Sequence, residues 1–245
     1  MFTLFDTHEL RARVVPSVIV LLPLLSTLFF CFPQGEKSWP AFVSQGVVSL
    51  ACLYALTFVI RAKGRAIETK LWHSWGGVPS TRILRWRDNT LSKETKKQIQ
   101  ELVLSMWGVQ LLPESAEKTD PVRADRLIVD TFSQIKEFLR LQDKEGLWLK
   151  QNAEYGFARN LLANRDLYVL FCAFGILACI LCAQHARRPI VNVGTGMNLL
   201  FLMVGALVGW RFLPSVTKET ADRYAERAWL TFLLLAGRPG ADTRK

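Results

Sequence analysis

The sequence predicts an all-α integral membrane protein of four transmembrane helices, arranged as two hairpins with a basic helical cytoplasmic domain inserted between them. Three observations predict this fold. Half of the 245 residues are hydrophobic, and they gather into four blocks, whereas a soluble core needs apolar residues at amphipathic spacing throughout the chain. Each block has a length close to that of a bilayer span. Lysines and arginines flank the blocks unequally.

The apolar blocks define the two hairpins. At about 1.5 Å per residue, blocks of this length match a hydrocarbon layer of about 30 Å. The first block is longer than the apolar region of a signal peptide, and no small-x-small cleavage site follows it, so we expect it to stay in the protein. The spans are expected at residues 14–32, 41–60, 167–183 and 197–213, so that the hairpins cover residues 14–60 and 167–213.

The flanking charges orient the spans. Near the span ends, one side carries twelve lysines and arginines and the other side three. Because basic residues stay on the cytoplasmic side, this bias places the N-terminal tail (1–13), the insert (61–166) and the C-terminal region (214–245) in the cytoplasm. We expect a protein of the bacterial inner or plasma membrane, with the lipid bilayer as the partner of its spans.

The spans contain no ionisable residue at depth, which disfavours a proton-coupled transporter. They do contain small residues at helical spacing, such as Gly205 and Gly209, which share one face of the fourth span. Small residues let two helices approach closely. The glycine pair therefore predicts either packing within one four-helix bundle or self-association into a homo-oligomer.

The insert reads as helical, with clear start and stop signals. Ser92 is the expected N-cap of a helix that ends near Gly108, and Asp120 followed by Pro121 starts another. Residues 114–119 read as a polar loop. The apolar stripe of the second helix is expected in a core, and it comprises Ile128, Phe132, Ile135 and Leu139.

Two more helices are expected at the end of the insert and after the fourth span. One begins near Lys144 and continues into the third span. The other covers residues 216–236 and is amphipathic, with alanines and aromatic residues along one side. This second helix could lie on the membrane surface or pack on the insert.

The block from Lys70 to Thr90 carries the densest cluster of polar and aromatic residues, and it predicts an anion site. A Gly-Gly turn frees backbone N–H groups, and a helix that starts near Pro79 adds its positive end. Two arginines one turn apart can bind phosphate oxygens together, and tryptophans can stack on a base or lie at the headgroup layer. The predicted ligand-binding residues are Trp75, Gly76, Gly77, Ser80, Thr81, Arg82, Arg85 and Trp86.

Three anions fit this composition: headgroups of anionic lipid, a small phosphorylated ligand such as a nucleotide, and nucleic acid. Because the spans explain much of the net charge of +10, nucleic acid is the least favoured. His73 and Asp88 are weak candidates for a catalytic acid–base pair, since spacing does not bring them together. The Walker, HExxH and GxSxG motifs do not occur.

The cysteines predict neither a metal site nor a cofactor. All five lie in apolar blocks, where thiols behave as small hydrophobic groups. Cys179 and Cys182 have the spacing of a metal or redox pair, but neither a second pair nor a histidine ligand stands near them in the sequence. We therefore interpret them as packing residues.

The block W-G-G-x-P-S-T-R-x-L-R-x-R-D, from Trp75 to Asp88, and Y-G-F-A-R-N, from Tyr155 to Asn160, resemble segments of uncharacterised bacterial multispan membrane proteins. Some of those proteins resemble membrane effectors of phage-defence loci, so the resemblance implies a role in antiviral defence. It implies no established activity and no catalytic residues.

Together these features predict a non-enzymatic membrane effector or sensor. Its basic domain would bind an anionic ligand or lipid headgroups and control the assembly of the membrane helices. Two alternatives stand beside this hypothesis. One is a membrane-bound enzyme that acts on a phosphorylated or lipid substrate, and the other is a scaffold that recruits soluble partners.

Overall fold

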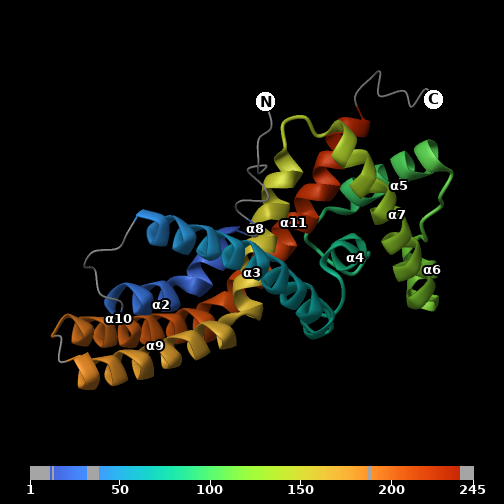
Figure 1. Ribbon diagram of the computed structural model, residues 1–245. Helices are drawn as coiled ribbons and strands as arrows, with labels where there is room; N and C mark the ends of the chain where they lie inside the picture. Colours follow the sequence, from blue (N-terminus) through green and yellow to red (C-terminus); the bar gives the residue numbers. More distant parts are fainter. Residues whose placement is uncertain (1–11, 13, 32–38, 187–188, 238–245) are drawn as a thin grey trace. The chain divides into compact units, whose positions relative to one another are not determined.

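A computed structural model of the chain describes residues 12, 14–31, 39–186 and 189–237. Every regular element in these ranges is a helix, and they contain no strand (Figure 1). The predicted all-helical class is therefore confirmed for the described residues. Nearly all of the predicted N-terminal tail, and residues 238–245 of the C-terminal region, lie outside them.

The helices of the expected insert lie between the apolar helices along the chain. The helices before and after the insert are α2 (Val15–Cys31), α9 (Arg165–Ala186), α10 (Pro189–Leu207), the π-helix η2 (Val208–Phe212) and α11 (Leu213–Ala236). Helix α3 (Trp39–Ser74) continues from the second expected span into the insert, and the helices within the insert are α4 (Pro79–Leu84), α5 (Lys93–Trp107), α6 (Glu114–Thr119), α7 (Pro121–Gln142) and α8 (Leu147–Ala163).

The chain divides into two compact units. Unit 1 combines Met1–Glu68 with Gly156–Thr217, and unit 2 combines Thr69–Tyr155 with Lys218–Lys245. Helices α3, α8 and α11 each contribute residues to both units. The C-terminal helix, expected either on the membrane surface or packed on the insert, shares unit 2 with most of the insert.

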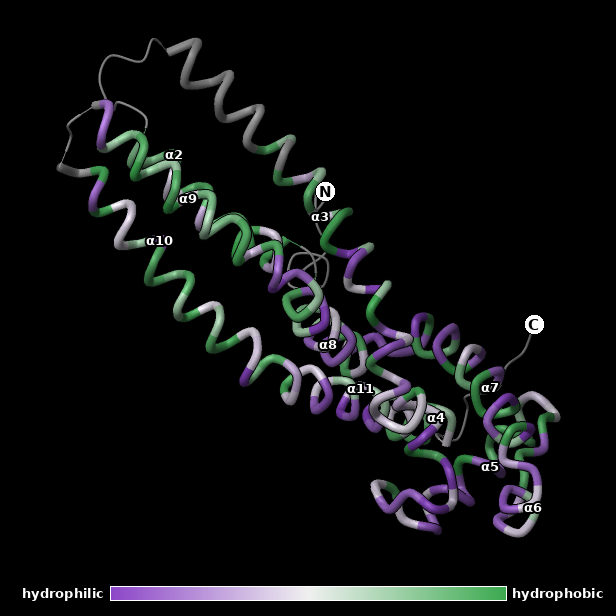
Figure 2. Tube along the Cα trace, turned by 90° about the horizontal axis from the view of Figure 1, so that it is seen from below, coloured by the Kyte–Doolittle hydropathy of each residue, from purple (hydrophilic) through white to green (hydrophobic). Residues whose placement is uncertain are grey.

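Unit 1 holds the apolar helices. Helix α9 packs against α2 and α10, and α2 also packs against α10. Two helical stretches, Arg165–His185 and Val191–Ala236, are long and apolar enough to cross a membrane, and Val15–Cys31 is a shorter apolar helix. Figure 2 shows the hydrophobic colouring that runs along α2, α9 and α10.

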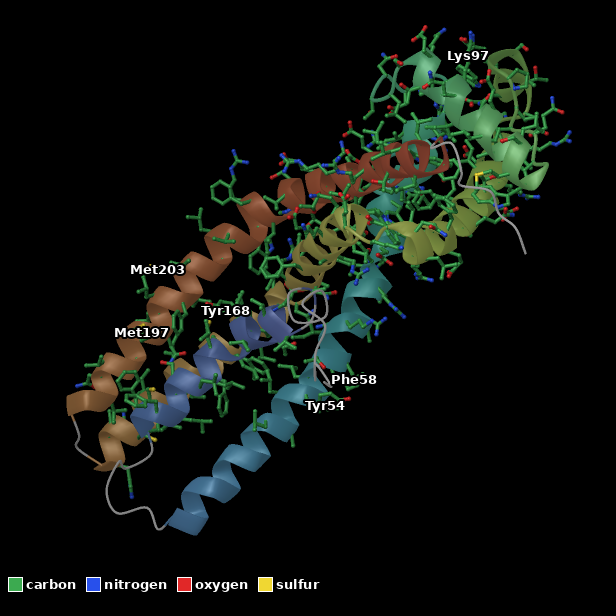
Figure 3. All side chains as sticks on the ribbon, turned by 90° about the horizontal axis from the view of Figure 1, so that it is seen from above. Tyr54, Phe58, Lys97, Tyr168, Met197 and Met203 are labelled. Atoms are coloured by element: carbon green, nitrogen blue, oxygen red, sulfur yellow. The ribbon has the colours of Figure 1, made fainter. Side chains whose placement is uncertain are left out.

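The polarity of unit 1 is reversed relative to a soluble protein. Large apolar side chains are exposed on the outside of α9 and α10, including Leu170, Phe174, Met203 and Leu207. The side chains of Tyr54 and Phe58 are exposed on α3 (Figure 3). Hydroxyl and amide side chains are buried beside apolar ones such as Val20 and Ile60, and they are Ser17, Thr27, Thr57, Asn160, Asn164, Asn198 and Thr217.

Unit 2 has the opposite pattern, with an apolar core and a charged exterior. Its core joins α4, α5 and α7 to the first part of α8 and to α11. Aromatic side chains pack within it: the ring centroids of Phe132 and Trp229 are 5.2 Å apart, and those of Trp107 and Phe232 are 5.4 Å apart. The amphipathic C-terminal helix therefore packs on the insert, which decides between the two expected positions.

Several helix ends follow the sequence signals. The Ser92 hydroxyl accepts a hydrogen bond from Thr95 N at 3.1 Å, and Gly108 ends α5 in the left-handed conformation. The Asp120 carboxylate accepts from Arg123 N at 3.0 Å at the start of α7. The predicted stripe of this helix is buried in the core: Ile128, Phe132, Ile135 and Leu139.

Two expectations about the insert were wrong. Residues 114–119 form the short helix α6, because Glu114 and Glu117 occupy its first turn, where carboxylates favour the helix start. The helix expected to begin near Lys144 and enter the third span starts at Leu147, where the Asp143 carboxylate accepts from the first backbone N–H groups. It ends at Ala163, and α9 begins separately at Arg165.

Candidate functional site

The predicted glycine turn ends helix α3. Gly76 and Gly77 have φ values of 82° and 128°, which only glycine adopts readily. Gly77 N donates to Trp72 O at 2.8 Å, and Gly76 N donates to His73 O at 3.3 Å. The N–H groups that were expected to bind an anion therefore close the end of the helix instead.

Arg85 connects this turn to α7. Its Nε donates to Asp125 Oδ1 at 2.7 Å, its Nη2 donates to Asp125 Oδ2 at 2.5 Å, and its Nη1 donates to Gly76 O at 3.0 Å. The whole residue is buried. Such a two-point bond to a carboxylate is the geometry that was expected for a phosphate. The Asp125 carboxylate therefore already accepts the hydrogen bonds that Arg85 was expected to donate to a phosphate.

Arg82 connects α4 to α11. Its Nη2 forms an ion pair with Asp222, and its Nη1 lies 3.7 Å from Asp88 Oδ2. The side chains of Arg82 and Asp222 remain 23% and 30% exposed. Each predicted arginine thus binds its own carboxylate, and Arg82 is the one that solvent reaches more easily.

Burial removes three predicted residues from any surface site. Ser80 and Thr81 are buried, and the carbonyl of Ser80 accepts from Trp229 Nε1 at 3.0 Å. Trp86 is also buried, with its Nε1 donating to Leu112 O at 3.0 Å. Helix α4 packs against α7, and the hydrogen bond from Trp229 joins it to α11, so Ser80 and Thr81 belong to the core. Trp75 stays half-buried.

A buried lysine holds the segment after α4. Lys96 Nζ donates to Arg85 O at 2.6 Å and to Asp88 O, and the residue has no exposed surface. Burial lowers the pKa of Lys96, although Asp88 and Glu117 oppose that shift. The backbone N–H of Trp86 donates to both Glu117 oxygens, at 3.1 and 3.2 Å. Lys96 and Glu117 thus both bind the backbone of the segment that follows α4.

His73 and Asp88, the candidate catalytic pair, do not contact each other. His73 is exposed near the end of α3. Asp88 instead accepts from Thr90 N at 2.8 Å and lies beside Arg82. Within the part of the chain that the structure describes, no contact joins His73 to Asp88, so the arrangement does not favour acid–base chemistry at these residues.

A polar contact lies inside the apolar helices of unit 1. Asn198 Nδ2 on α10 donates to Thr27 Oγ1 on α2 at 3.2 Å and to Gly194 O at 3.0 Å. Gly175 on α9 faces both side chains, so closely that a β-carbon there would overlap Thr27 Oγ1 and stand 2.6 Å from Asn198 Oδ1. Three helices meet at this point, and no pattern in the sequence indicates that Asn198 pairs with Thr27.

The predicted glycine face packs within one chain. A β-carbon at Gly205 would overlap the ring of Tyr168 on α9, the residue labelled in Figure 3. Gly209 lies against Arg165, whose Nη1 donates to Gly209 O at 3.3 Å and whose guanidinium stands 4.8 Å from the ring centre of Trp210. Intramolecular packing therefore accounts for both glycines, and self-association through this face stays a prediction.

The second segment of the resemblance, Tyr155 to Asn160, supplies a polar junction in unit 1. Arg159 Nη1 binds Glu68 Oε1 at 2.5 Å, and Asn160 Nδ2 donates to Ala12 O at 2.7 Å. Gly64 makes room for Asn160, because a β-carbon there would overlap its amide oxygen. The junction thus joins α3 and α8 to Ala12, three residues before α2 begins.

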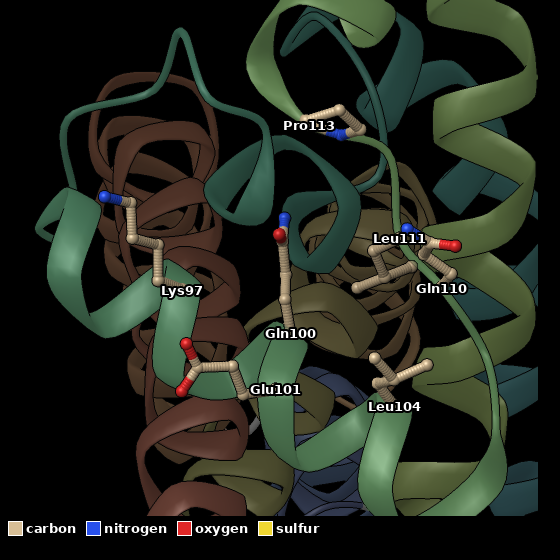
Figure 4. A pocket seen from close by; sticks show the side chains of 7 residues that line it. All are labelled: Lys97, Gln100, Glu101, Leu104, Gln110, Leu111 and Pro113. Atoms are coloured by element: carbon tan, nitrogen blue, oxygen red, sulfur yellow. The ribbon is translucent and has the colours of Figure 1, made fainter.

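A cavity of about 230 Å³ opens on another side of unit 2 (Figure 4). It contains none of the predicted site residues. Its lining combines charged, amide and apolar side chains from α5 and the segment after it: Lys97, Gln100, Glu101, Leu104, Gln110, Leu111 and Pro113.

Comparisons with protein-family models, with curated proteins and with solved structures find no match to this chain.

Proposed function

We propose that this chain is a non-enzymatic multispan membrane protein, a sensor or effector. Its cytoplasmic helical unit would bind a phosphorylated anion at Arg82 and pass the change to the membrane helices through α11. The observation that carries the proposal is the ion pair between Arg82 and Asp222. It joins the predicted anion site to the helix that continues directly from α10 and η2.

The membrane assignment is supported by the reversed polarity of unit 1. Exposing side chains such as Phe174 and Met203 to water while burying Asn198 and Thr27 would be unfavourable for a soluble protein. In a bilayer the same pattern is favourable, because lipid covers the apolar face and polar groups bond to one another inside. We extend this to four spans, with α2 and the first part of α3 as the first hairpin.

The orientation follows from charge. The twelve-to-three distribution of basic residues around the spans favours a cytoplasmic unit 2 and cytoplasmic termini in a bacterial inner membrane. An anionic ligand would then be a cytoplasmic metabolite or the headgroup of a lipid in the inner leaflet. Both offer phosphate oxygens, which is the chemistry that a guanidinium recognises.

Ligand binding would exchange one anion for another at Arg82. Arg82 is already paired, so a phosphate that binds it must displace the Asp222 carboxylate, and both side chains are exposed enough for a solute to reach them. Once Asp222 is released, α11 loses a contact with α4. Because α11 continues from the apolar helix α10, the release would change the equilibrium between arrangements of the spans.

The alternatives have less support. The enzyme hypothesis depends on His73 and Asp88, which are not in contact. The scaffold hypothesis depends on a free amphipathic C-terminal helix, whereas Ala225, Trp229 and Phe232 of α11 lie in the core of unit 2. The nucleic-acid hypothesis loses Trp86 as a stacking surface because that side chain is buried.

Exchange predicts opposite effects of two substitutions on anion affinity. Asp222→Asn removes the competing carboxylate, so affinity is expected to rise by about fivefold to tenfold, the equivalent of about 1 kcal/mol. Arg82→Ala is expected to abolish binding. Affinity is measured on the full chain in detergent micelles, by calorimetry with inorganic phosphate and with a nucleoside triphosphate. Repeating the phosphate titration on protein in phosphatidylcholine nanodiscs, with or without phosphatidylglycerol, separates the two sources, because a lipid headgroup that binds Arg82 would compete with the added phosphate.

Arg87 provides the control, since it is an exposed cation in the same segment. Arg87→Ala is expected to leave the affinity for phosphate nearly unchanged. Equal losses for Arg82→Ala and Arg87→Ala, without a gain for Asp222→Asn, would contradict the exchange. Those results would indicate diffuse attraction between basic residues and anions.

A further inference from the structure

Two cysteines that are far apart in the sequence, Cys31 and Cys179, meet at one end of the apolar helices of unit 1. Cys31 is the last residue of α2, and its Sγ lies 3.6 Å from the Sγ of Cys179 on α9. Cys182 lies one turn further along α9. Cys31 thus brings a third sulfur to the Cys179-x-x-Cys182 pair, which the sequence alone had left incomplete.

The exposure of the three thiols differs. Cys179 is buried, whereas Cys31 and Cys182 are partly exposed. Cys172, two turns before Cys179 on the same helix, is buried and lies outside the cluster. Cys31 is the last residue of α2 and lies one residue from the end of the expected span 14–32, so an oxidant at the membrane surface can reach it, while Cys179 stands next to Cys31 and can complete a bond.

The geometry favours a disulfide over a metal. The part of the chain that the structure describes holds no group of three or more cysteine, histidine or acidic side chains arranged to bind a metal ion. The two sulfurs lie 3.6 Å apart, so they must approach each other to about 2.05 Å to form a disulfide. The α2–α9 packing already holds the two backbones beside each other.

We propose that Cys31 and Cys179 are a modification site that closes into an intramolecular disulfide between α2 and α9. The oxidant is a disulfide, such as that of a thiol oxidoreductase. The location of the cysteine pair at the outer face of the membrane rests on the proposed function and its orientation. The ability of the two thiols to form a disulfide does not depend on that orientation.

The reaction is a two-electron thiol–disulfide exchange. The Cys31 sulfur loses its proton and attacks one sulfur of the oxidant, which forms a mixed disulfide and releases one thiol. The Cys179 sulfur then loses its proton and attacks the Cys31 sulfur, which releases the second thiol. Two cysteines are oxidised to one disulfide, and the oxidant is reduced to two thiols.

The test counts free thiols on the full chain. Membranes and detergent micelles are treated with diamide, a permeant diazene that accepts two electrons and two protons as two thiols become a disulfide. After denaturation, a maleimide-linked polyethylene glycol adds one mass increment per free thiol. Reduced protein is expected to show five increments, since the chain has five cysteines. Oxidised protein is expected to show two fewer.

Cysteine variants identify the bond. In Cys31→Ser the thiol count is expected to be the same before and after oxidation, and in the control Cys172→Ser the loss of two increments is expected to persist. Retention of all five thiols by the oxidised wild type would overturn the proposal, as would a loss that persists in Cys31→Ser or a diamide-dependent covalent dimer.

The source of the oxidant is tested separately. Trapping untreated cells with acid and counting thiols is expected to show the bond in protein made without added oxidant. If diamide closes the bond in membranes but cells show five free thiols, the proposed orientation fails while the thiol site stands.

Discussion

A Gly175→Ala variant is expected to lose about 2–4 kcal/mol of stability in the apolar helices of unit 1. The added β-carbon would overlap Thr27 Oγ1 and crowd Asn198, so α9 must move away from both α2 and α10. Overpacking of a well-packed site costs about 1–3 kcal/mol, and loss of the hydrogen bond from Asn198 to Thr27 costs about 1 kcal/mol more in a membrane. Unfolding by sodium dodecyl sulfate, followed by far-ultraviolet circular dichroism, measures the change.

Gly196 provides a matched control for this substitution. It lies on α10, close to Asn198, and a β-carbon there meets no atom within 4 Å. Gly196→Ala is expected to change the stability by less than about 0.5 kcal/mol. If the two alanine variants unfold at the same concentration of detergent, the three-helix contact at Gly175 is not the one described.

A Lys96→Met variant is expected to destabilise unit 2 by about 2–4 kcal/mol. Methionine fills much of the space of the lysine side chain but cannot donate to Arg85 O or Asp88 O. Each buried carbonyl left without a partner costs about 1–3 kcal/mol, and the absence of a buried charge offsets part of that loss. Urea unfolding followed by tryptophan fluorescence reports on unit 2, which holds six of the eight tryptophans.

The control for this prediction is Lys97→Met, because Lys97 is the next residue on α5 and is exposed. We expect it to unfold like the wild type. The pH dependence adds a second test. Burial lowers the folded-state pKa of Lys96, so the unfolded chain binds more protons and stability rises with pH up to the ordinary value of 10.5. The rise in the stability of unit 2 with pH should disappear in Lys96→Met and persist in Lys97→Met. Equal curves for both variants would contradict the role of Lys96.

The local structure of unit 2 was largely predictable from the sequence. The caps at Ser92 and Asp120 and the stripe on α7 depend on residues close together in the chain, so the patterns were readable. The partners of the arginines were not, since Asp125 and Asp222 are far from Arg85 and Arg82 in the sequence. One signal was present: Lys96 falls on the same helical face as Ile99 and Val103, and all three are buried. A lysine on an otherwise apolar helix face indicates that its ammonium group donates hydrogen bonds inside the core.

The helices of unit 1 were predictable as apolar blocks, but their contacts were not. Every face of such a helix is apolar, so hydropathy does not show which side packs against protein and which against lipid. The glycine spacing at Gly205 and Gly209 indicated close approach without identifying the partner, which is Tyr168 and Arg165 of the same chain. The thiol cluster was hidden for the same reason, because Cys31 and Cys179 meet through tertiary packing.

The central claim, that apolar spans separate a cytoplasmic unit 2 from the outer face, is tested most directly by labelling of single cysteines in intact cells. With the native cysteines replaced, Ser115→Cys on α6 and Gln184→Cys near the end of α9 introduce one thiol each, both at exposed positions. An impermeant maleimide is expected to label Gln184→Cys in intact cells, and Ser115→Cys only after the membrane is permeabilised. Labelling of Ser115→Cys in intact cells, or protection of both positions until the cells are broken, would contradict the account.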